Sequence, residues 1–149
     1  MLKKVSIVVV LVIAALAAFL FQSGKIYSLF QKDIQFFEAK TACDLYVGSC
    51  EVILHNDKTI TLNIDKPFSA GKAMNFNVRA EGFEDDEFFV QIYGLNMDMG
   101  IFEYPLVKTD SGSYVSKVFV PTCMGGKMSW QVNIISKKEN IGAGFVLEL

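Results

Sequence analysis

The stretch CEVILHNDKTITLNI, residues 50–64, shows the pattern that decides the fold. It holds two short runs of alternating or β-branched residues, Cys50–His55 and Lys58–Ile64. The turn formers Asn56 and Asp57 separate them. Because the alternation has a period of two, each run is typical of a strand with one buried face. The stretch therefore predicts two strands joined by a tight turn.

The same pattern continues to the end of the sequence, and turn-forming residues interrupt it at regular intervals. Regularly spaced short strands with polar connections are typical of sandwiches and small barrels. We therefore predict an all-β domain, an Ig-like or cupredoxin-like β-sandwich. Its further strands are expected at Lys72–Ala80, Glu87–Tyr93, Ile101–Lys108, Ser113–Val120, Lys127–Ser136 and Gly142–Leu149.

The N-terminus has a different character. After Lys3 and Lys4 the sequence reads VSIVVVLVIAALAAFLF, from Val5 to Phe21, with Ser6 as its one polar residue. A spanning helix needs about 17–25 apolar residues, whereas the apolar stretch of a cleavable signal is about 7–15 residues long. The length favours an uncleaved single-pass anchor, residues 1–21, over a cleaved signal. The two lysines orient it with the rest of the chain outside the cytoplasm.

Between the anchor and the β region, residues 22–41 carry apolar side chains loosely at helical spacing. This segment predicts a juxtamembrane helix or stalk. Its aromatic residues are compatible with two interpretations: they lie at the membrane interface, or they pack on the domain. The sequence pattern does not distinguish between these interpretations. The domain itself is expected to cover residues 42–149.

Composition excludes several function classes. Residues 42–149 contain nine lysines and arginines and fourteen aspartates and glutamates, a net charge of −5, so a nucleic-acid partner is not expected. The acidic run from Glu81 to Glu87 lacks the spacing of an EF-hand and predicts a solvated turn. The single histidine, His55, is expected to be an exposed strand-end residue. Without a Ser-centred elbow or paired carboxylates, the chain is not expected to be an enzyme.

Two of the three cysteines lie close together, in CDLYVGSC, residues 43–50. In an oxidising compartment this spacing predicts a local disulfide between Cys43 and Cys50. A redox-active pair is the alternative. Cys123 has no partner in this pairing, which is what a free thiol or a metal ligand would show.

Cys123 lies in PTCMGGKMSW, residues 121–130. If Gly125 and Gly126 form the centre of a two-residue hairpin, Cys123 faces Met128 across the ladder, and Trp130 lies on the same face as Met128. A second sulfur pair, Met97 and Met99, lies two residues apart in GLNMDMG, which places both thioethers on one side of an extended chain.

These four residues could converge on one ion. Thiolate and thioether ligands select Cu(I) over harder divalent ions. Methionine is also an ordinary filler of irregular core gaps, so packing in the core is the competing interpretation.

The motifs CDLYVGSC, GLNMDMG and PTCMGGKMSWQ behind one N-terminal anchor resemble the FixH/YtkA-like family of small membrane-anchored periplasmic proteins, which is associated with copper delivery and cytochrome oxidase assembly. The resemblance covers residues 42–136 and implies an Ig-like periplasmic domain held at the inner membrane. It implies a role in copper handling or oxidase maturation, with a Sco-type copper protein or an oxidase subunit as partner. Met97, Met99, Cys123 and Met128 would then bind Cu(I), and Trp130 would shield the ion from water. The alternative is a metal-free, membrane-tethered interaction or assembly module.

Overall fold

The computed structural model describes residue 12 and residues 33–39, 43–122 and 126–149. The chain divides into two compact units, residues 1–33 and 34–149. Apart from Val12, the predicted anchor lies outside the described residues, as does most of the predicted stalk. In the part of the chain that the structure describes, no helix combines the length and apolar character needed to cross a membrane.

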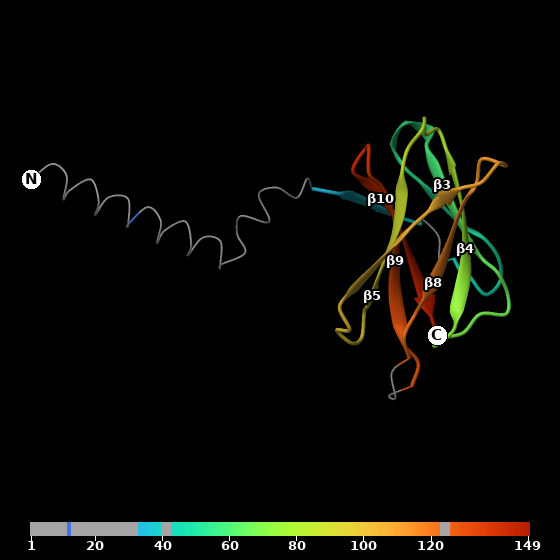
Figure 1. Cartoon of the computed structure of the whole chain (residues 1–149), viewed down its shortest axis with the longest axis vertical. Helices are drawn as coiled ribbons and strands as arrows, with labels where there is room; N and C mark the ends of the chain where they lie inside the picture. Colours follow the sequence, from blue (N-terminus) through green and yellow to red (C-terminus); the bar gives the residue numbers. More distant parts are fainter. Residues whose placement is uncertain (1–11, 13–32, 40–42, 123–125) are drawn as a thin grey trace, which may run out of the picture. The chain divides into compact units, whose positions relative to one another are not determined.

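Residues 34–149 form two β-sheets (Figure 1). Sheet A has the strand order β1-β10-β9-β5-β6, and sheet B has the order β2-β3-β4-β8-β7. The strands of sheet A are β1 (Gln35–Glu38), β10 (Ile141–Glu148), β9 (Ser129–Ser136), β5 (Phe88–Gly94) and β6 (Ile101–Pro105). Those of sheet B are β2 (Cys50–Ile53), β3 (Thr59–Ile64), β4 (Ala73–Glu81), β8 (Tyr114–Phe119) and β7 (Val107–Lys108).

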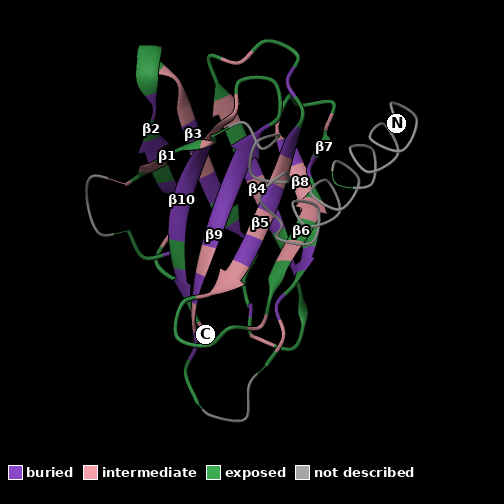
Figure 2. Cartoon of the chain, turned by 90° about the vertical axis from the view of Figure 1, so that its left-hand side faces the viewer, coloured by how far each residue is buried: buried purple, intermediate pink, exposed green. Residues whose placement is uncertain are grey.

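The inward faces of the two sheets share one hydrophobic core. Alternate residues of β3 are buried, namely Ile60, Leu62 and Ile64, whereas β9 is buried at consecutive positions from Val132 to Ser136. Figure 2 shows the extensive burial along the central strands of sheet A. The strands lie where the sequence pattern predicts them and form two sheets, so the all-β, two-sheet prediction is confirmed.

Each strand predicted from the sequence has a counterpart, but one of them is divided. The predicted strand Ile101–Lys108 becomes β6 and β7, which belong to different sheets. Pro105 has no N–H to continue the ladder, and the buried Leu106 turns its own N–H to the carbonyl of Phe88, at 3.0 Å. The chain thereby changes sheet within two residues.

The predicted hairpin centred on Gly125 and Gly126 is wrong. The strand before it, β8, pairs with β4 and β7 in sheet B, whereas the strand after it, β9, pairs with β5 and β10 in sheet A. The segment between them, of which residues 123–125 lie outside the described part, therefore crosses from one sheet to the other. A Gly-Gly pair indicates a turn, but it does not determine whether the flanking strands pair with each other.

The domain also begins earlier than the predicted boundary at residue 42. Gln35–Glu38, placed in the stalk by its helical spacing, instead forms β1, which runs parallel to β10. Phe37 packs against the core, with its ring edge-on to the exposed imidazole of His55 at a centroid distance of 4.7 Å. Of the two interpretations left open for the aromatic residues, packing on the domain applies to Phe37. A four-residue edge strand is too short for its own periodicity to reveal it.

Candidate metal site

The two methionine-bearing segments meet at one end of the sandwich. The connection from β5 to β6 is docked on the start of β9 by three hydrogen bonds. The N–H of Leu95 donates to the carbonyl of Ser129 at 2.8 Å. The Asn96 side chain donates through Nδ2 to the carbonyl of Lys127 at 3.2 Å and accepts at Oδ1 from the N–H of Ser129 at 3.3 Å. These bonds join residues that lie more than thirty positions apart in the sequence.

Met128 is held by the C-terminus. Its N–H donates to the carbonyl of Leu149 at 2.7 Å, and the N–H of Leu149 donates back at 2.9 Å. This pair extends the ladder between β9 and β10 beyond both strands. Cys123, the predicted cross-strand neighbour of Met128, lies outside the described residues, so its contact with Met128 stays a prediction. The side chain of Met128 is 5% exposed.

Gly94 makes the close approach of the two segments possible. A Cβ atom built on Gly94 would overlap the main-chain oxygen of Met97 and would lie 3.5 Å from Cε of Met128. The main chain at Met97 and the tip of the Met128 side chain therefore converge on the same small volume. Any larger residue at position 94 must push them away from it.

Met97 and Met99 have different surroundings. The main chain bends at residues 95–97 instead of remaining extended, and the N–H of Gly100 donates to Oδ1 of Asp98 at 3.0 Å. Met97 is 44% exposed, whereas Met99 is half-buried and packs against the core. Exposure therefore decreases from Met97 through Met99 to Met128, which is buried.

Trp130 lies two residues after Met128 and, like Met128, faces the core. Its side chain is 0% exposed, and its Nε1 has no hydrogen-bond acceptor among the described residues. The shared face of Met128 and Trp130 is thus as predicted. Trp130 is therefore part of the hydrophobic core.

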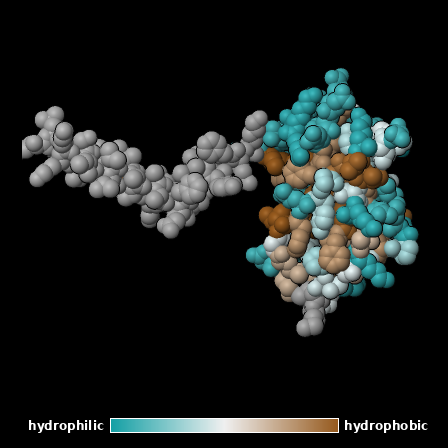
Figure 3. Space-filling view, in the orientation of Figure 1, coloured by the Kyte–Doolittle hydropathy of each residue, from teal (hydrophilic) through white to brown (hydrophobic). Residues whose placement is uncertain are grey.

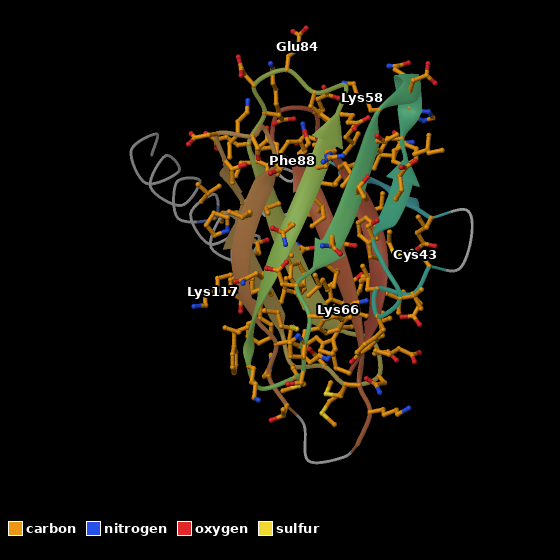
Figure 4. The ribbon with its side chains drawn as sticks, turned by 90° about the vertical axis from the view of Figure 1, so that its right-hand side faces the viewer. Cys43, Lys58, Lys66, Glu84, Phe88 and Lys117 are labelled. Carbon is orange, nitrogen blue, oxygen red and sulfur yellow. A yellow bond between two sulfur atoms is a disulfide. The ribbon has the colours of Figure 1, made fainter. Side chains whose placement is uncertain are left out.

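The remaining sulfur ligand of the predicted set, Cys123, lies outside the described residues. Thr122 and Gly126, the described residues on either side of the segment 123–125, are exposed. Figure 4 shows sulfur atoms at this end of the domain. Within the described ranges, no three histidine, cysteine, aspartate or glutamate side chains are grouped so that they could hold a metal ion. The sulfur-bearing residues that the structure describes in the two adjoining segments are the thioethers Met97, Met99 and Met128.

The predicted disulfide joins Cys43 to Cys50. Cys50 is buried, and Cys43 is exposed at the rim of a cleft of about 460 Å³. Residues 43–46 form one wall of this cleft, and Lys127 and residues 146–149 form the other. The disulfide therefore constrains the chain next to the C-terminal residues that hold Met128.

The acidic run was only partly interpreted correctly. Glu84, Asp85 and Glu87 are exposed, but Asp86 is buried. Its carboxylate accepts hydrogen bonds from the hydroxyl of Ser136 and, at 3.1 Å, from the N–H of Lys138. The Asp86 side chain therefore holds the β9–β10 connection through these hydrogen bonds. Nothing in the local sequence distinguishes Asp86 from its acidic neighbours. Asn96 was missed for the same reason: its role depends on a strand distant in sequence.

The site lies at the end of the domain opposite the point where the chain enters. Gln35 pairs with Ile141 at the start of β10, whereas Met128 pairs with Leu149 just beyond its last residue, Glu148. The entry end is polar, with an ion pair between Lys58 and Glu139, and Figure 3 shows hydrophilic residues gathered there. At about 3.3 Å per residue, the eight residues of β10 separate the two ends by roughly 25 Å.

Comparison with known proteins gives no family assignment: no protein-family model matches the sequence, and no curated protein matches it significantly.

Proposed function

We propose that this protein is a membrane-anchored periplasmic protein that binds Cu(I) as cargo through Met97, Met99, Cys123 and Met128. The observation that carries the proposal is the docking of the β5–β6 connection on the start of β9. Through Leu95 and Asn96 this contact brings two methionine-bearing segments together although β8 and β9 form no hairpin.

The chemistry of the gathered donors fits Cu(I). Thioethers are soft, neutral ligands, and a thiolate from Cys123 would add the charge that a monovalent soft ion favours. Met128, which is buried and held by Leu149, would be the fixed ligand. Met97, on the surface, would be the ligand that an acceptor protein can replace. Trp130 would keep water from the inner side of the ion.

The strand order supports an Ig-like assignment of the sandwich. In Ig-like domains one sheet has the order A-B-E-D and the other groups strands G, F and C, with C′ added in some members. The order β3-β4-β8-β7 corresponds to the first and β10-β9-β5-β6 to the second. An Ig-like periplasmic domain behind a transmembrane helix at residues 1–21 is what membership of the FixH/YtkA-like family would imply.

We call the end of the sandwich that carries Met97, Met99 and Met128 the sulfur end. Its position suggests where a partner would bind. The preceding chain joins the domain at the opposite end, roughly 25 Å away along β10. We propose that a partner's periplasmic domain contacts this end of the β-sandwich. A Sco-type copper protein or the periplasmic domain of an oxidase subunit fits this placement, and assistance in cytochrome oxidase assembly would follow.

The test is a Cu(I) titration of the full chain against a competing chelator, with ascorbate as reductant so that the Cys43–Cys50 disulfide is retained. We expect 1:1 binding. Cys123→Ser and Met128→Leu each remove one donor and are expected to weaken binding at least about tenfold, or about 1.4 kcal/mol. Asn96→Ala removes no sulfur but releases the docked segment, so it should weaken binding as well.

Met74→Leu is the matched control, because Met74 is a buried methionine of β4 that we assign to the core. Leucine has a similar volume, so each Met→Leu change should cost less than about 1.5 kcal/mol in stability and leave the fold intact. If the wild type and all variants compete equally poorly for Cu(I), the sulfur set is a packing feature. The metal-free interaction module then becomes the working model.

A further inference from the structure

The outer face of sheet B carries a second candidate site, on the side of the sandwich that Figure 4 faces. Two hollows lie on it, of about 580 Å³ and about 450 Å³. Asn77 lines both, so they adjoin on the surface of β3, β4 and β8, and the two together are here called the groove. The size of each hollow falls in the range of small-ligand sites. Sulfur-bearing residues are absent from the lining among the described residues, and the groove is separate from the Cu(I) site.

Side-chain amides line the groove on neighbouring strands. Asn63 and Asn77 are register partners, and Asn75 lies two residues before Asn77 on the same face of β4. Asp65 fixes two of these amides: its Oδ1 accepts from Nδ2 of Asn77 at 2.7 Å, and its Oδ2 accepts from Nδ2 of Asn75 at 3.3 Å. Both amides are therefore held with their nitrogen atoms toward one carboxylate.

In this orientation the amides of Asn75 and Asn77, which line the groove, keep unused hydrogen-bond donors and acceptors. A side-chain amide has two N–H donors and an oxygen with two lone pairs, and Asp65 uses one N–H of each. In the described part of the chain, no side-chain hydrogen bond to Oδ1 of Asn75 or Asn77 is found. A pair of amides held in this way presents donors and acceptors side by side, which is the complement of two adjacent hydroxyl groups.

The other wall of the larger hollow is apolar. Tyr104 is half-buried, and its hydroxyl donates to the carbonyl of Phe119 at 2.7 Å, which fixes the ring. Pro105 and Val107 continue this wall. The groove thus combines a fixed aromatic ring with fixed amides, and cationic side chains, Lys117 and Arg79, line its two parts.

We infer that this groove binds a saccharide chain. Sugar rings offer adjacent hydroxyls to paired amides and an apolar face to an aromatic ring, and the groove provides both. An extended peptide fits less well, because peptides add to sheet edges, whereas β3, β4 and β8 are interior strands with neighbours on both sides.

The test is a nuclear magnetic resonance titration of the ¹⁵N-labelled full chain in a detergent that contains no sugar. The probes are the β-1,4-linked tetramer of N-acetylglucosamine and, separately, trigalacturonate, whose carboxylates would pair with Lys117. We expect the side-chain amide signals of Asn75 and Asn77 to shift at millimolar saccharide. Asn77→Ala should weaken binding at least about tenfold, which corresponds to about 1.4 kcal/mol.

Gln35→Ala is the matched control, because it removes an exposed side-chain amide from sheet A and should leave binding unchanged. A preserved backbone spectrum of Asn77→Ala shows that the variant is folded. The inference is overturned if neither saccharide shifts the Asn75 and Asn77 signals, or if an unstructured Gly-Ser peptide shifts them equally. Cu(I) binding is not involved, so this result and the copper titration are independent.

Discussion

Replacing Gly94 by alanine is expected to lower the free energy of unfolding by about 2 kcal/mol and to weaken Cu(I) binding at least about tenfold. The new Cβ would overlap the main-chain oxygen of Met97, which cannot rotate away as a flexible side chain could. Relief requires the docked segment to move away from β9, which disturbs its hydrogen bonds to Lys127 and Ser129. Chemical denaturation and the chelator competition measure the two effects on one sample.

Gly48→Ala is the control for the chemical change itself. A Cβ at Gly48 would have no neighbour within 4 Å, and the residue does not have a positive φ. We expect the free energy of unfolding of this variant to lie within about 0.5 kcal/mol of the wild-type value. If Gly94→Ala were as stable as Gly48→Ala and bound Cu(I) normally, the close approach at Gly94 would have no part in the site.

A chain that begins at Ala42 is expected to be less stable than one that begins at Ile34 by about 3 kcal/mol. The shorter chain loses β1, the burial of Phe37 and the parallel pairing with residues 141–144 of β10. Half-burial of a phenylalanine stabilises by about 1 kcal/mol, and each exchanged hydrogen bond adds about 0.5–1.5 kcal/mol. For a domain of this size, the midpoint of thermal unfolding should fall by roughly 10 °C.

Phe37→Ala in the chain that begins at Ile34 separates the two contributions, because it removes the buried ring and retains the main-chain pairing. The stability of this variant should lie between that of the chain that begins at Ile34 and that of the chain that begins at Ala42. The shorter chain should also associate more readily, since the uncovered side of β10 becomes an exposed sheet edge. Equal melting temperatures for the chains that begin at Ile34 and Ala42 would show that β1 is not an integral strand of the domain.

The strands of the sandwich were predictable because their signal is local. In β3 the residues Ile60, Leu62 and Ile64 are buried and their neighbours are not, and this alternation can be read without knowing the partner strand. The Cys43–Cys50 disulfide was predictable for the same reason, since both cysteines lie in one short loop. The exposure of His55 follows from its place at a strand end.

The members of the candidate site remain a prediction from the sequence, and the hairpin on which their predicted geometry rested does not form. The sequence drew attention to Met97, Met99, Cys123 and Met128, yet the contact predicted between Cys123 and Met128 depended on a hairpin that does not form. The contact that does form depends on Asn96, whose partners are Lys127 and Ser129. No local pattern identifies an asparagine that docks on a distant strand.

The sequence by itself determined the β character, the alternating burial of strands such as β3, the disulfide and the soft-donor composition, because each rests on neighbours within a few positions. Only the tertiary structure decided which strands share a sheet, that Gln35–Glu38 belongs to the domain, and that Met128 pairs with Leu149. It also placed the sulfur end opposite the entry of the chain. These features depend on pairings between distant segments, whose stability comes from the core they bury together rather than from any residue's own preference.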